Sequence, residues 1–386
     1  MYPDLSYIFH DLFGTEYDNW TQIFKTFGLF LVLAILSAAF VLYKDLKRKA
    51  EEGKMPYTIS KSTIGAPPEA RDLLLSTIIG FIVFYKLGYV LLDFEAFRID
   101  PAASILSLKG NALTGVLGGL LHTAQRYFKQ KKAQLPSPKT IETKIFPHDR
   151  IGEITMVAAI SGIIGAKLFA ALETPKEFLQ DPLGMLLSGG GLAIYGGLIG
   201  GLIGISRYLK KHKISLLEFA DSVVIALFLA YGVGRLGCHF SGDGDWGIVA
   251  ASMPEWWFLP DWLWSYDYPH NVAKEGVLLE NCQAIYCRVL PQGVYPTSIY
   301  EAVLAFGMSG FLWSRRKKMS VVGGLACLYL VMNGVERFFI EKIRVNATYD
   351  WPLGLKPTQA EIIAVVFVLS GIGLWLYLKQ KSKQEK

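Results

Sequence analysis

Residues 24–43 read FKTFGLFLVLAILSAAFVLY, and this stretch decides the class of fold. Lys25 is its only charged residue, and about 20 mostly apolar residues are what a helix needs to cross a bilayer. Four acidic residues precede it within residues 1–21, whereas the basic run KDLKRK follows at 44–49. A cleavable signal peptide has the reverse charge pattern, so we expect this helix to remain in the membrane as an anchor.

The composition of the whole chain agrees with a membrane protein. Of its 386 residues, 52% are hydrophobic and 19% are charged, and the mean hydropathy is +0.33. These values exclude an ordinary soluble protein and a disordered chain. The 4 cysteines are too few for a disulfide scaffold, and neither a C-x2-C pair nor a His-x3-His spacing indicates zinc. We therefore expect no metal and no cofactor.

Nine membrane-spanning helices account for the distribution of charge. Clear spans are expected at 24–43, 72–93, 154–173, 214–236, 297–314, 320–341 and 359–378, and weaker, glycine-rich ones at 104–125 and 183–206. With nine spans, one side of the membrane carries 26 of the 39 lysines and arginines, whereas residues 1–21 on the other side carry none. The positive-inside rule then places the N-terminus outside and the C-terminus in the cytoplasm. The predicted fold is an all-α polytopic membrane protein with about nine transmembrane helices and a long outer loop between helices six and seven.

An internal duplication divides the chain. Residues 78–132 align with 159–213 at an offset of 81, matching Lys86-Leu87 with Lys167-Leu168 and Arg126-Tyr127 with Arg207-Tyr208. Each copy is predicted to be a two-helix hairpin, repeated in the same orientation. We expect residues 1–54 to form an outer segment and the first helix, 55–133 to form an extra hairpin that is the degenerate copy, and 134–386 to form a core with an outer loop at 238–296.

Basic residues inside a membrane are costly and indicate function by default. Six lie within or at the edges of spans: Lys25, Lys86, Lys109, Lys167, Arg235 and Arg337. Lys25 and Lys109 can reach the interface with their flexible side chains. A structural role is as plausible as a functional one for Lys86 and Lys167, which occupy equivalent positions of the repeat.

Arg235 differs because of its neighbours. The segment Gly234-Arg-Leu-Gly-Cys-His-Phe-Ser-Gly-Asp-Gly-Asp-Trp-Gly247 brings a guanidinium, a thiol, an imidazole and two carboxylates to the outer end of the sixth helix. Its glycines permit tight turns and close approach of a ligand. A purely structural exit loop is the alternative.

Two further motifs lie at outer helix ends. Arg337, Glu341 and Arg344 have the spacing of one helical face, so they form either a self-satisfied ion pair or a guanidinium held for an anion. The seventh helix opens with Tyr295-Pro-Thr-Ser-Ile-Tyr-Glu301, in which Glu301 is explained equally well by its place near a positive helix end.

The outer loop is rich in tryptophan. Five of the 9 tryptophans, at 246, 256, 257, 262 and 264, lie in its first third. They indicate either an interfacial aromatic belt or a cap over a lipid entrance. Cys282 and Cys287 lie outside, where oxidation is possible, so their Cys-x4-Cys spacing is compatible with a disulfide.

Together these motifs resemble the prolipoprotein diacylglyceryl transferase family. The resemblance rests on Gly234-Arg-Leu-Gly237 with Asp243 six residues later, on Tyr195-Gly-Gly-Leu-Ile-Gly-Gly201, on Tyr295–Glu301 and on Arg337-x3-Glu341-x2-Arg344. Thr26-Phe-Gly-Leu29 is similar to the family's opening motif. The resemblance covers residues 20–43 and 150–378.

The resemblance implies a multi-pass enzyme of the bacterial inner membrane whose active site faces the periplasmic side. It implies transfer of a diacylglyceryl group from phosphatidylglycerol to the lipobox cysteine of a preprolipoprotein, which forms a thioether and releases glycerol phosphate. The implied partners are phosphatidylglycerol, preprolipoprotein signal peptides and membrane lipid, and no nucleic acid. The nucleophile is the substrate thiol, which needs a base or a positive field because a free cysteine has a pKa near 8.5.

The family pattern also implies roles for residues of this chain. Arg235 and Arg337 are expected to hold the phosphate, Asp243 to replace the usual glutamate, and Glu341 and Arg344 to complete the second pair. The other expected substrate-binding positions are Gly196, Gly197, Gly200, Gly234, Gly237, Cys238, Tyr300 and Glu301. For the three glycines at 196, 197 and 200, close packing of membrane helices is a compatible alternative.

The chain departs from the family pattern at several points. Tyrosine stands at 195 and 295 where histidine is common, cysteine stands at 238 where asparagine is common, and an extra residue separates Asp243 from Trp246. Residues 55–133 are absent from the usual seven-helix plan. His239 is therefore the expected base, and Asp243 and Tyr195 are alternatives.

These departures leave a second function open, namely a non-catalytic relative that binds or moves anionic lipid. A small-molecule transporter is disfavoured because the charged groups gather on one side rather than at the midplane.

Overall fold

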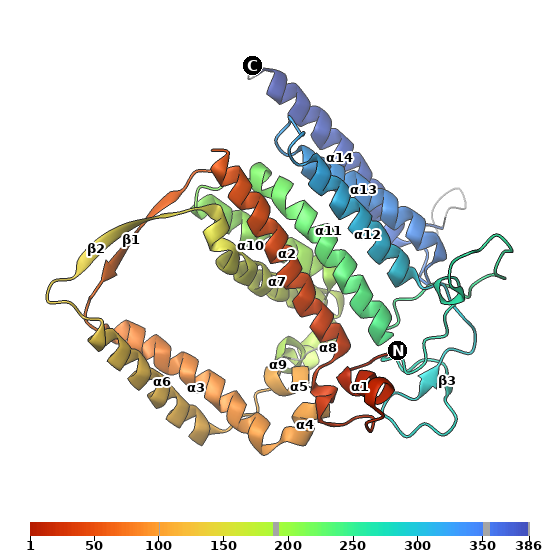
Figure 1. Ribbon diagram of the computed structural model, residues 1–386, viewed down its shortest axis with the longest axis horizontal. Coiled ribbons are helices and arrows are strands. Elements are labelled where there is room, and N and C mark those ends of the chain that lie inside the picture. Colours follow the sequence, from red (N-terminus) through yellow and green to blue (C-terminus); the bar gives the residue numbers. More distant parts are fainter. Residues whose placement is uncertain (100, 188–192, 350–355, 385–386) are drawn as a thin grey trace. The chain divides into compact units, whose positions relative to one another are not determined.

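The computed structural model describes residues 1–99, 101–187, 193–349 and 356–384. Its contacts divide the chain into two compact units, labelled by element in Figure 1. The core unit comprises Met1–Met55 and Ile214–Lys386, and the hairpin unit comprises Pro56–Lys213. This division differs from the boundaries expected from the sequence, because it places both copies of the repeat in one unit.

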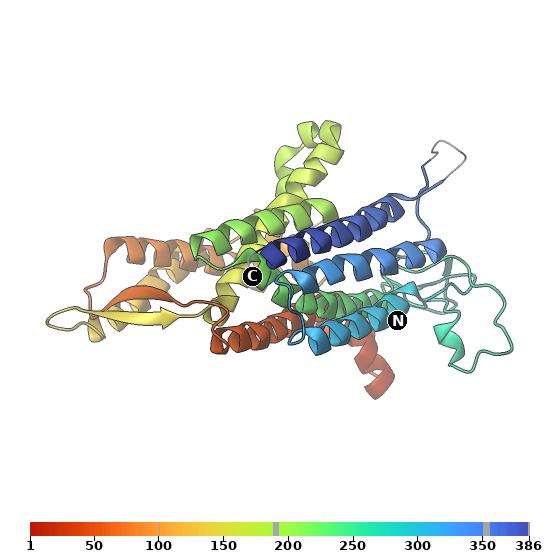
Figure 2. The ribbon, with the colours of Figure 1, turned by 90° about the horizontal axis from the view of Figure 1, so that it is seen from above.

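The core unit is built from long helices that lie side by side (Figures 1 and 2). They are α2 (Thr26–Glu51), α11 (Leu216–Ser241), α12 (Thr297–Arg315), α13 (Gly324–Ile340) and α14 (Gln359–Gln384). α11 contacts α2, α12 and α13, and α14 packs on α13. The buried apolar cluster that joins α11, α12 and α13 consists of Val224, Ile225, Phe228, Leu312 and Leu325.

Several helices have the length and composition to cross a membrane. Within the described residues these are 5: α2, α11 and α14 of the core unit, and α3 (Ala70–Leu92) and α7 (Ile151–Glu173) of the hairpin unit. In the apolar window of α11, 44% of the residues are buried, against 17% in α2 and 22% in α14. α11 is therefore the central helix of the core unit, and the other two present apolar side chains outward. The chain is a mostly helical, multi-pass membrane protein.

The internal duplication is confirmed in the hairpin unit. The elements α3, α4 (Phe94–Ile99) and α5 (Pro101–Leu106) recur 81 residues later as α7, α8 (Pro175–Gln180) and α9 (Pro182–Leu187). α3 packs against α6 (Ala112–Lys132), and α7 packs against α10 (Ile194–Lys211). Each copy is a hairpin of two long helices with two short helices at its turn.

The predicted span 104–125 is wrong at its start, because the long helix begins at Ala112. In the predicted span 183–206, α10 begins at Ile194 and residues 188–192 lie outside the described residues. In the first copy, Asn111 caps α6 by accepting a hydrogen bond from the Thr114 backbone N–H at 3.0 Å. A cap of this kind fixes where a helix begins, whatever the hydropathy of the residues before it.

Lys86 and Lys167 have equivalent structural contacts. Lys86 Nζ donates to the Ser104 carbonyl at 3.3 Å, and Lys167 Nζ donates to the Met185 carbonyl at 2.8 Å. Ser104 and Met185 are matching positions of the two short helices, whose last carbonyls have no partner within the helix. The two lysines therefore stabilise the turns of the hairpins.

Two small antiparallel strand pairs add to the helices and were not predicted. β1 (Thr58–Ile64) pairs with β2 (Lys139–Ile145) in the hairpin unit, with Thr58 opposite Ile145. β3 (Val277–Leu278) pairs with β4 (Arg288–Val289) in the outer loop, where Cys282 and Cys287 form a disulfide. The N-terminal segment contains the short helix α1 (Leu5–Phe13) and the 3-10 turn η1 (Trp20–Ile23).

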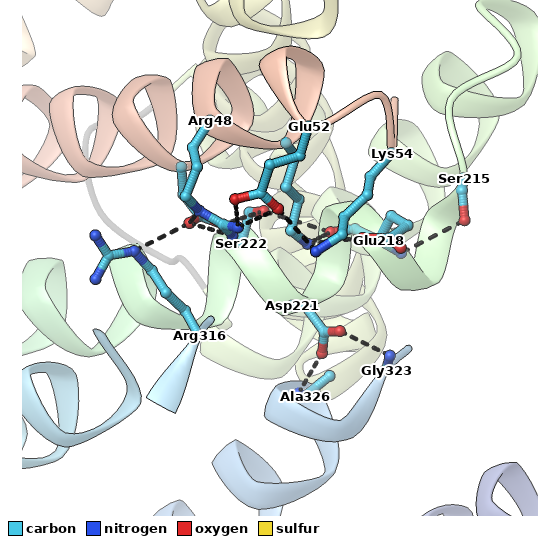
Figure 3. Close-up of polar contacts among 12 residues, drawn as sticks. Arg48, Glu52, Lys54, Ser215, Glu218, Asp221, Ser222, Arg316, Gly323 and Ala326 are labelled. Atoms are coloured by element: carbon cyan, nitrogen blue, oxygen red, sulfur yellow. Dashed lines mark hydrogen bonds and ion pairs between the residues drawn. The ribbon is translucent and has the colours of Figure 1, made fainter. Parts of the chain in front are cut away.

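Buried polar contacts join the core helices near the beginning of α11 (Figure 3). The fully buried Asp45 of α2 accepts from Arg48 at 2.8 Å and from the Ser222 hydroxyl at 2.7 Å. Asp221 accepts from the backbone N–H groups of Gly323 and Ala326 at 2.7 and 3.0 Å, and so caps the first turn of α13. These contacts fix α2, α11 and α13 at one end, and the functional candidates lie near the other end of α11.

Candidate active site

Four charged side chains of the core unit form a closed ring. Arg235 Nε lies 2.6 Å from Glu301 Oε2, and Arg235 Nη1 contacts Asp245 Oδ2. Arg344 Nη1 lies 2.9 Å from Glu301 Oε1, and its Nη2 lies 2.5 Å from Asp245 Oδ1. Each arginine binds both carboxylates, and we call these four residues the arginine–carboxylate ring.

The ring is largely withdrawn from solvent. The exposed side-chain fraction is 0% for Glu301, 10% for Arg344, 14% for Arg235 and 35% for Asp245. Buried charges persist only when they are paired and hydrogen-bonded, and here two positive and two negative groups cancel. Asp245 is the open side of the ring.

A turn after α11 brings Asp245 back to Arg235. α11 ends at Ser241, five residues beyond the predicted span, so Arg235 lies on the helix rather than in an exit loop. Gly242 follows in the left-handed conformation, with φ 65°, and its N–H donates to the Cys238 carbonyl at 3.0 Å. This is a common helix C-cap for which glycine is favoured.

The segment that begins at Asp245 contacts the two other segments that supply ring residues, namely the start of α12 and the residues at Arg344. Thr297, the first residue of α12, donates its hydroxyl to the Asp245 carbonyl at 3.1 Å. Gly247 forms a β-bridge with Arg344, and a Cβ at Gly247 would lie 2.5 Å from the Ile343 carbonyl oxygen. Glycine is therefore required at this position if Arg344 is to reach the ring.

Glu301 does not act as a helix cap. Its carboxylate binds the two arginines and accepts a hydrogen bond from the Tyr231 hydroxyl. The Tyr231 ring also lies beneath Arg235, whose Cζ is 5.1 Å from the ring centroid. Tyr231 was missed in the sequence, although its position one helical turn before Arg235 could have indicated it.

Arg337 and Glu341 form the predicted i,i+4 ion pair, with Nη2 and Oε2 2.9 Å apart. The predicted common face with Arg344 is wrong, because α13 ends at Ile340 and Arg344 has an extended backbone with ψ 156°. Arg344 therefore joins the arginine–carboxylate ring. Besides its ion pair with Arg337, Glu341 accepts a hydrogen bond from the Asn346 side-chain amide at 2.7 Å.

Among the arginines of the site, Arg337 has the fewest carboxylate contacts within the described residues. Arg235 and Arg344 each contact two carboxylates, whereas the contacts of the described residues give Arg337 one, and 25% of its side chain is exposed. An incoming anion therefore finds unused N–H groups mainly on Arg337.

Glu336 is a buried carboxylate that the sequence did not single out. It is 7% exposed, and neither of its oxygens has a hydrogen-bond partner in the part of the chain that the structure describes. It interacts electrostatically with Glu301, Arg337, Arg235 and Arg344. The ring and Arg337 are thus both close enough to influence the same carboxylate.

Asp243 and Asp245 differ in environment. The ion pairs of the ring go to Asp245, to which no role was assigned from the sequence. Asp243 instead has an oxygen within 4.8 Å of the Cys238 sulfur. Burial raises the pKa of Asp243, and the neighbouring Asp245 raises it further. Although burial opposes ionisation, Arg235 and Arg344 hold the pKa of Asp245 below its usual value. Two neighbouring carboxyl groups whose pKa values are shifted in opposite directions are suited to different acid–base roles.

The same residues could be mistaken for a metal site. Ligand atoms of Cys238, Asp243 and Asp245 all lie within 4.8 Å of one another. Both Asp245 oxygens already contact guanidinium groups, however, and a cation would have to displace these arginines. The donor set fits an acid–base pair better than a metal centre.

His239 lies one helical turn after Arg235 and is 4% exposed. Its Nδ1 is 3.1 Å from the Tyr268 hydroxyl, and its ring packs beside Trp262 and Tyr266. The structure thus holds the His239 imidazole in one orientation, one helical turn from Arg235.

Tyr195 and the glycines that follow it belong to α10 in the hairpin unit. A Cβ at Gly196 would lie 2.4 Å from the Gly165 carbonyl oxygen, and one at Gly200 would lie 2.4 Å from the Ser161 carbonyl oxygen, both on α7. At Gly197 the nearest atom would be at an ordinary 3.6 Å. Helix packing therefore explains Gly196 and Gly200, and Tyr195 is described within its own unit only.

The remaining candidates lie around the ring in the core unit. A Cβ at Gly237 would meet Phe30 of α2 at 2.8 Å, whereas Gly234 has no such neighbour within 4 Å. Tyr300 donates its hydroxyl to the Leu263 carbonyl at 2.5 Å and so anchors the outer loop to α12.

In that loop Trp256, Trp257 and Trp264 pack together, whereas Trp246 is buried in the cluster with Tyr268 and Val294.

Comparison with known proteins adds to this geometry. Residues 132–377 match the family model of prolipoprotein diacylglyceryl transferase. The matched segment contains the arginine–carboxylate ring, Arg337 and both helices α7 and α10, and it begins after α2.

Similar proteins carry the same description. Phosphatidylglycerol–prolipoprotein diacylglyceryl transferase 2 of Clostridium perfringens (strain 13 / Type A) is 30% identical over 241 residues, which are 62% of this chain and 83% of that protein. The enzymes named phosphatidylglycerol–prolipoprotein diacylglyceryl transferase of Clostridioides difficile (strain 630) and Chlorobaculum tepidum are each 28% identical, over 61% and 65% of this chain and 81% of each relative. Because the family model spans more than half of the chain, the chain belongs to the prolipoprotein diacylglyceryl transferase family and is a membrane transferase.

Proposed function

We propose that this chain transfers a diacylglyceryl group from phosphatidylglycerol to the lipobox cysteine of preprolipoproteins. One observation carries the proposal. The segment that matches the family contains both the arginine–carboxylate ring and Arg337, which has fewer carboxylate contacts among the described residues than the two arginines of the ring. An anionic phospholipid needs guanidinium groups at the membrane boundary, because they bind phosphate through several N–H groups and keep their charge.

The membrane arrangement is part of the proposal. The nine long helices found among the described residues all cross the bacterial inner membrane, with the N-terminus outside and the C-terminus in the cytoplasm. The positive-inside distribution of lysine and arginine supports this arrangement. The ring then faces the periplasmic side, together with the outer loop and its disulfide.

Arg337 and Arg235 bind the phosphate of the donor lipid in this mechanism. As the reaction proceeds, the phosphate changes from a diester monoanion to a monoester dianion. Positive groups fixed in advance stabilise that developing charge more than the ground state. Glu341 and Glu301 hold the two guanidinium groups in place.

The bond changes follow from the substrates. The cysteine sulfur forms a bond to the diacylglyceryl carbon that carries the phosphate, and the C–O bond at that carbon breaks. The electron pair of that bond leaves with glycerol phosphate, and the thiol proton passes to a base on the enzyme. The products are a thioether and glycerol phosphate.

Asp243 is the base that the structure supports best. Its raised pKa, its oxygen within 4.8 Å of the Cys238 sulfur and its electrostatic interaction with Arg235 support this assignment. A base with a pKa raised toward neutrality takes a thiol proton more readily than an ordinary aspartate. His239 is the alternative within the same turn, and Tyr195 stays a prediction from the family pattern.

Product release tests the function directly. The purified protein is incubated with phosphatidylglycerol and a lipobox peptide, and glycerol phosphate and the mass of the peptide are measured. We expect release of glycerol phosphate together with a diacylglyceryl adduct on the peptide, and neither with a peptide whose cysteine is replaced by serine. Binding of phosphatidylglycerol without release would favour the second function, a relative that binds or moves anionic lipid.

A further inference from the structure

A recess lies in the core unit beside the last turn of α11. It has a volume of about 560 Å³, and its walls come from the N-terminal segment, the end of α11 and the outer loop. The lining residues that matter here are Asp11, Tyr17, His239, Trp262, Tyr266 and His270. We call this recess the aromatic cavity. Its volume lies within the roughly 300–1,000 Å³ of typical ligand sites.

His239 lines the aromatic cavity and lies on the same helix as Arg235 of the arginine–carboxylate ring. It follows Arg235 by four residues on α11, a rise of about 6 Å along the helix. The Tyr268 hydroxyl engages Nδ1, and none of the hydrogen bonds among the described residues uses Nε2. A ligand that reaches from the ring toward the outer loop would therefore pass this nitrogen.

The backbone around the cavity is held in an uncommon conformation. Tyr268 and His270 have φ angles of 48° and 60°, in the left-handed region that side chains with a Cβ rarely adopt. His270 is fixed by a 2.7 Å contact between its Nδ1 and the Tyr286 carbonyl oxygen. Strained residues of this kind persist where the surrounding contacts impose them, and they gather at binding sites.

The lining favours a peptide over a phospholipid headgroup. No lysine or arginine lines the cavity in the described part of the chain. The Met1 amino group does line it, but burial lowers its pKa to about 6 and it donates to the Pro269 carbonyl at 2.8 Å, so a phosphate finds little positive charge there. Tyrosine and tryptophan side chains supply large contact areas with little loss of conformational freedom, as they do where proteins bind polypeptides. Among the described residues, Asp11 is the only acidic residue of the lining, and it disfavours negative ligands.

We propose that the aromatic cavity binds the residues that follow the lipobox cysteine of the acceptor protein in an extended conformation. This proposal rests on the proposed function, because the reacting cysteine must come within about 3–3.5 Å of the lipid carbon beside the arginines. The chain beyond that cysteine leaves the membrane on the side of the outer loop and meets the cavity. The preferred residues at these positions are uncharged or basic.

A set of peptides that differ at the second residue after the cysteine tests the proposal. Lysine, serine or aspartate is placed there, and KM is measured separately for the peptide and for phosphatidylglycerol. We expect the aspartate peptide to have a KM about three- to tenfold above that of the lysine peptide, and Asp11→Asn to remove most of this difference. Glu16→Gln, which changes an exposed acid of the same segment that does not line the cavity, is the matched control and should keep the difference.

Removal of an aromatic wall gives an independent readout. Trp262→Ala is expected to raise KM for every peptide about two- to tenfold and to leave KM for phosphatidylglycerol unchanged. Tyr349→Ala, which removes an aromatic residue that is 51% exposed and outside the cavity, is the control. A change of KM for the lipid alone in the Trp262 variant, or equal KM values for the three peptides, would overturn the proposal.

Peptide binding separates this proposal from the proposed function. Peptides with serine in place of the lipobox cysteine cannot react, and their affinity is measured directly with the unmodified protein and the two cavity variants. Absence of transfer with normal, Asp11-dependent binding would contradict the proposed function only. Normal transfer, together with the same peptide affinity in the unmodified protein and in both cavity variants, would contradict the cavity proposal only.

Discussion

Arg235 and Glu301 lie 2.6 Å apart, with 14% and 0% of their side chains exposed. Such a buried pair is not by itself a strong source of stability, because both groups lose their hydration. It is closed here by Arg344 and Asp245 into a ring with no net charge. We infer that the ring holds two guanidinium groups at the membrane boundary, and that a phosphate approaches it from the side of Arg337, which has one carboxylate contact among the described residues.

Glu301→Gln tests whether the ring depends on this carboxylate. The substitution leaves Asp245 as the carboxylate that pairs with both Arg235 and Arg344, so the buried ring carries an unbalanced positive charge. We therefore expect the free energy of unfolding to fall by about 3 kcal/mol and transfer to be lost. Denaturant unfolding in detergent and the transfer assay measure the two effects. Glu280→Gln, at an exposed position of the outer loop, is the control. Equal free energies of unfolding of the two variants would show that the ring does not depend on the charge of Glu301.

The sequence predicts the long apolar helices because hydropathy and charge act locally. It does not predict where α6 begins, because the side-chain cap at Asn111 overrides the hydropathy of the preceding residues. It also does not separate Asp245 from Asp243. The left-handed glycines 242 and 244 decide which carboxylate turns back to Arg235, and spacing along the chain does not show this.

The ring itself could be predicted only in part. Arg235, Glu301 and Arg344 were selected from motifs, but their mutual contacts depend on long-range packing. The end of α13 at Ile340 shows the reason, because a helix that continued to Arg344 would have placed this arginine on the face of Arg337. Glu336 has no sequence signal beyond its place before Arg337, and its importance comes from burial.

Neighbouring glycines of α10 provide a matched pair of variants. Gly196→Ala places a Cβ 2.4 Å from the Gly165 carbonyl oxygen, whereas Gly197→Ala places one at 3.6 Å from its nearest neighbour. We expect Gly196→Ala to lower the thermal unfolding temperature in detergent, because overpacking costs about 1–3 kcal/mol, and Gly197→Ala to leave it nearly unchanged. The same temperature for both variants would exclude close packing as the reason for glycine at 196.

The pH dependence of transfer tests the assignment of Asp243. Burial, followed by the effect of Asp245, raises the pKa of Asp243, so this carboxyl stays protonated to a higher pH than an ordinary aspartate and cannot accept a proton there. We expect transfer to rise with pH through this raised pKa, and Asp243→Asn to abolish transfer at every pH. If His239→Ala removed the rise instead, the histidine would be the base.

The same pKa shift has a consequence for stability. The unfolded chain loses this proton at a lower pH than the folded protein, so the free energy of unfolding should decrease as pH rises from the ordinary pKa of aspartate to the raised one. Asp243→Asn should remove this part of the pH dependence, which unfolding at a series of pH values would show.

The central claim is that Arg235 and Arg337 hold the phosphate of the donor lipid. The most direct test is transfer of a labelled diacylglyceryl group from phosphatidylglycerol to a lipobox peptide by Arg235→Ala and Arg337→Ala, each shown to insert into the membrane like the unmodified protein. Arg315→Ala, at the opposite end of α12 from Glu301, is the control. We expect each of the first two substitutions to reduce transfer at least about 100-fold, as loss of a transition-state donor does, and the control to leave it unchanged. Normal transfer by both variants would contradict the claim.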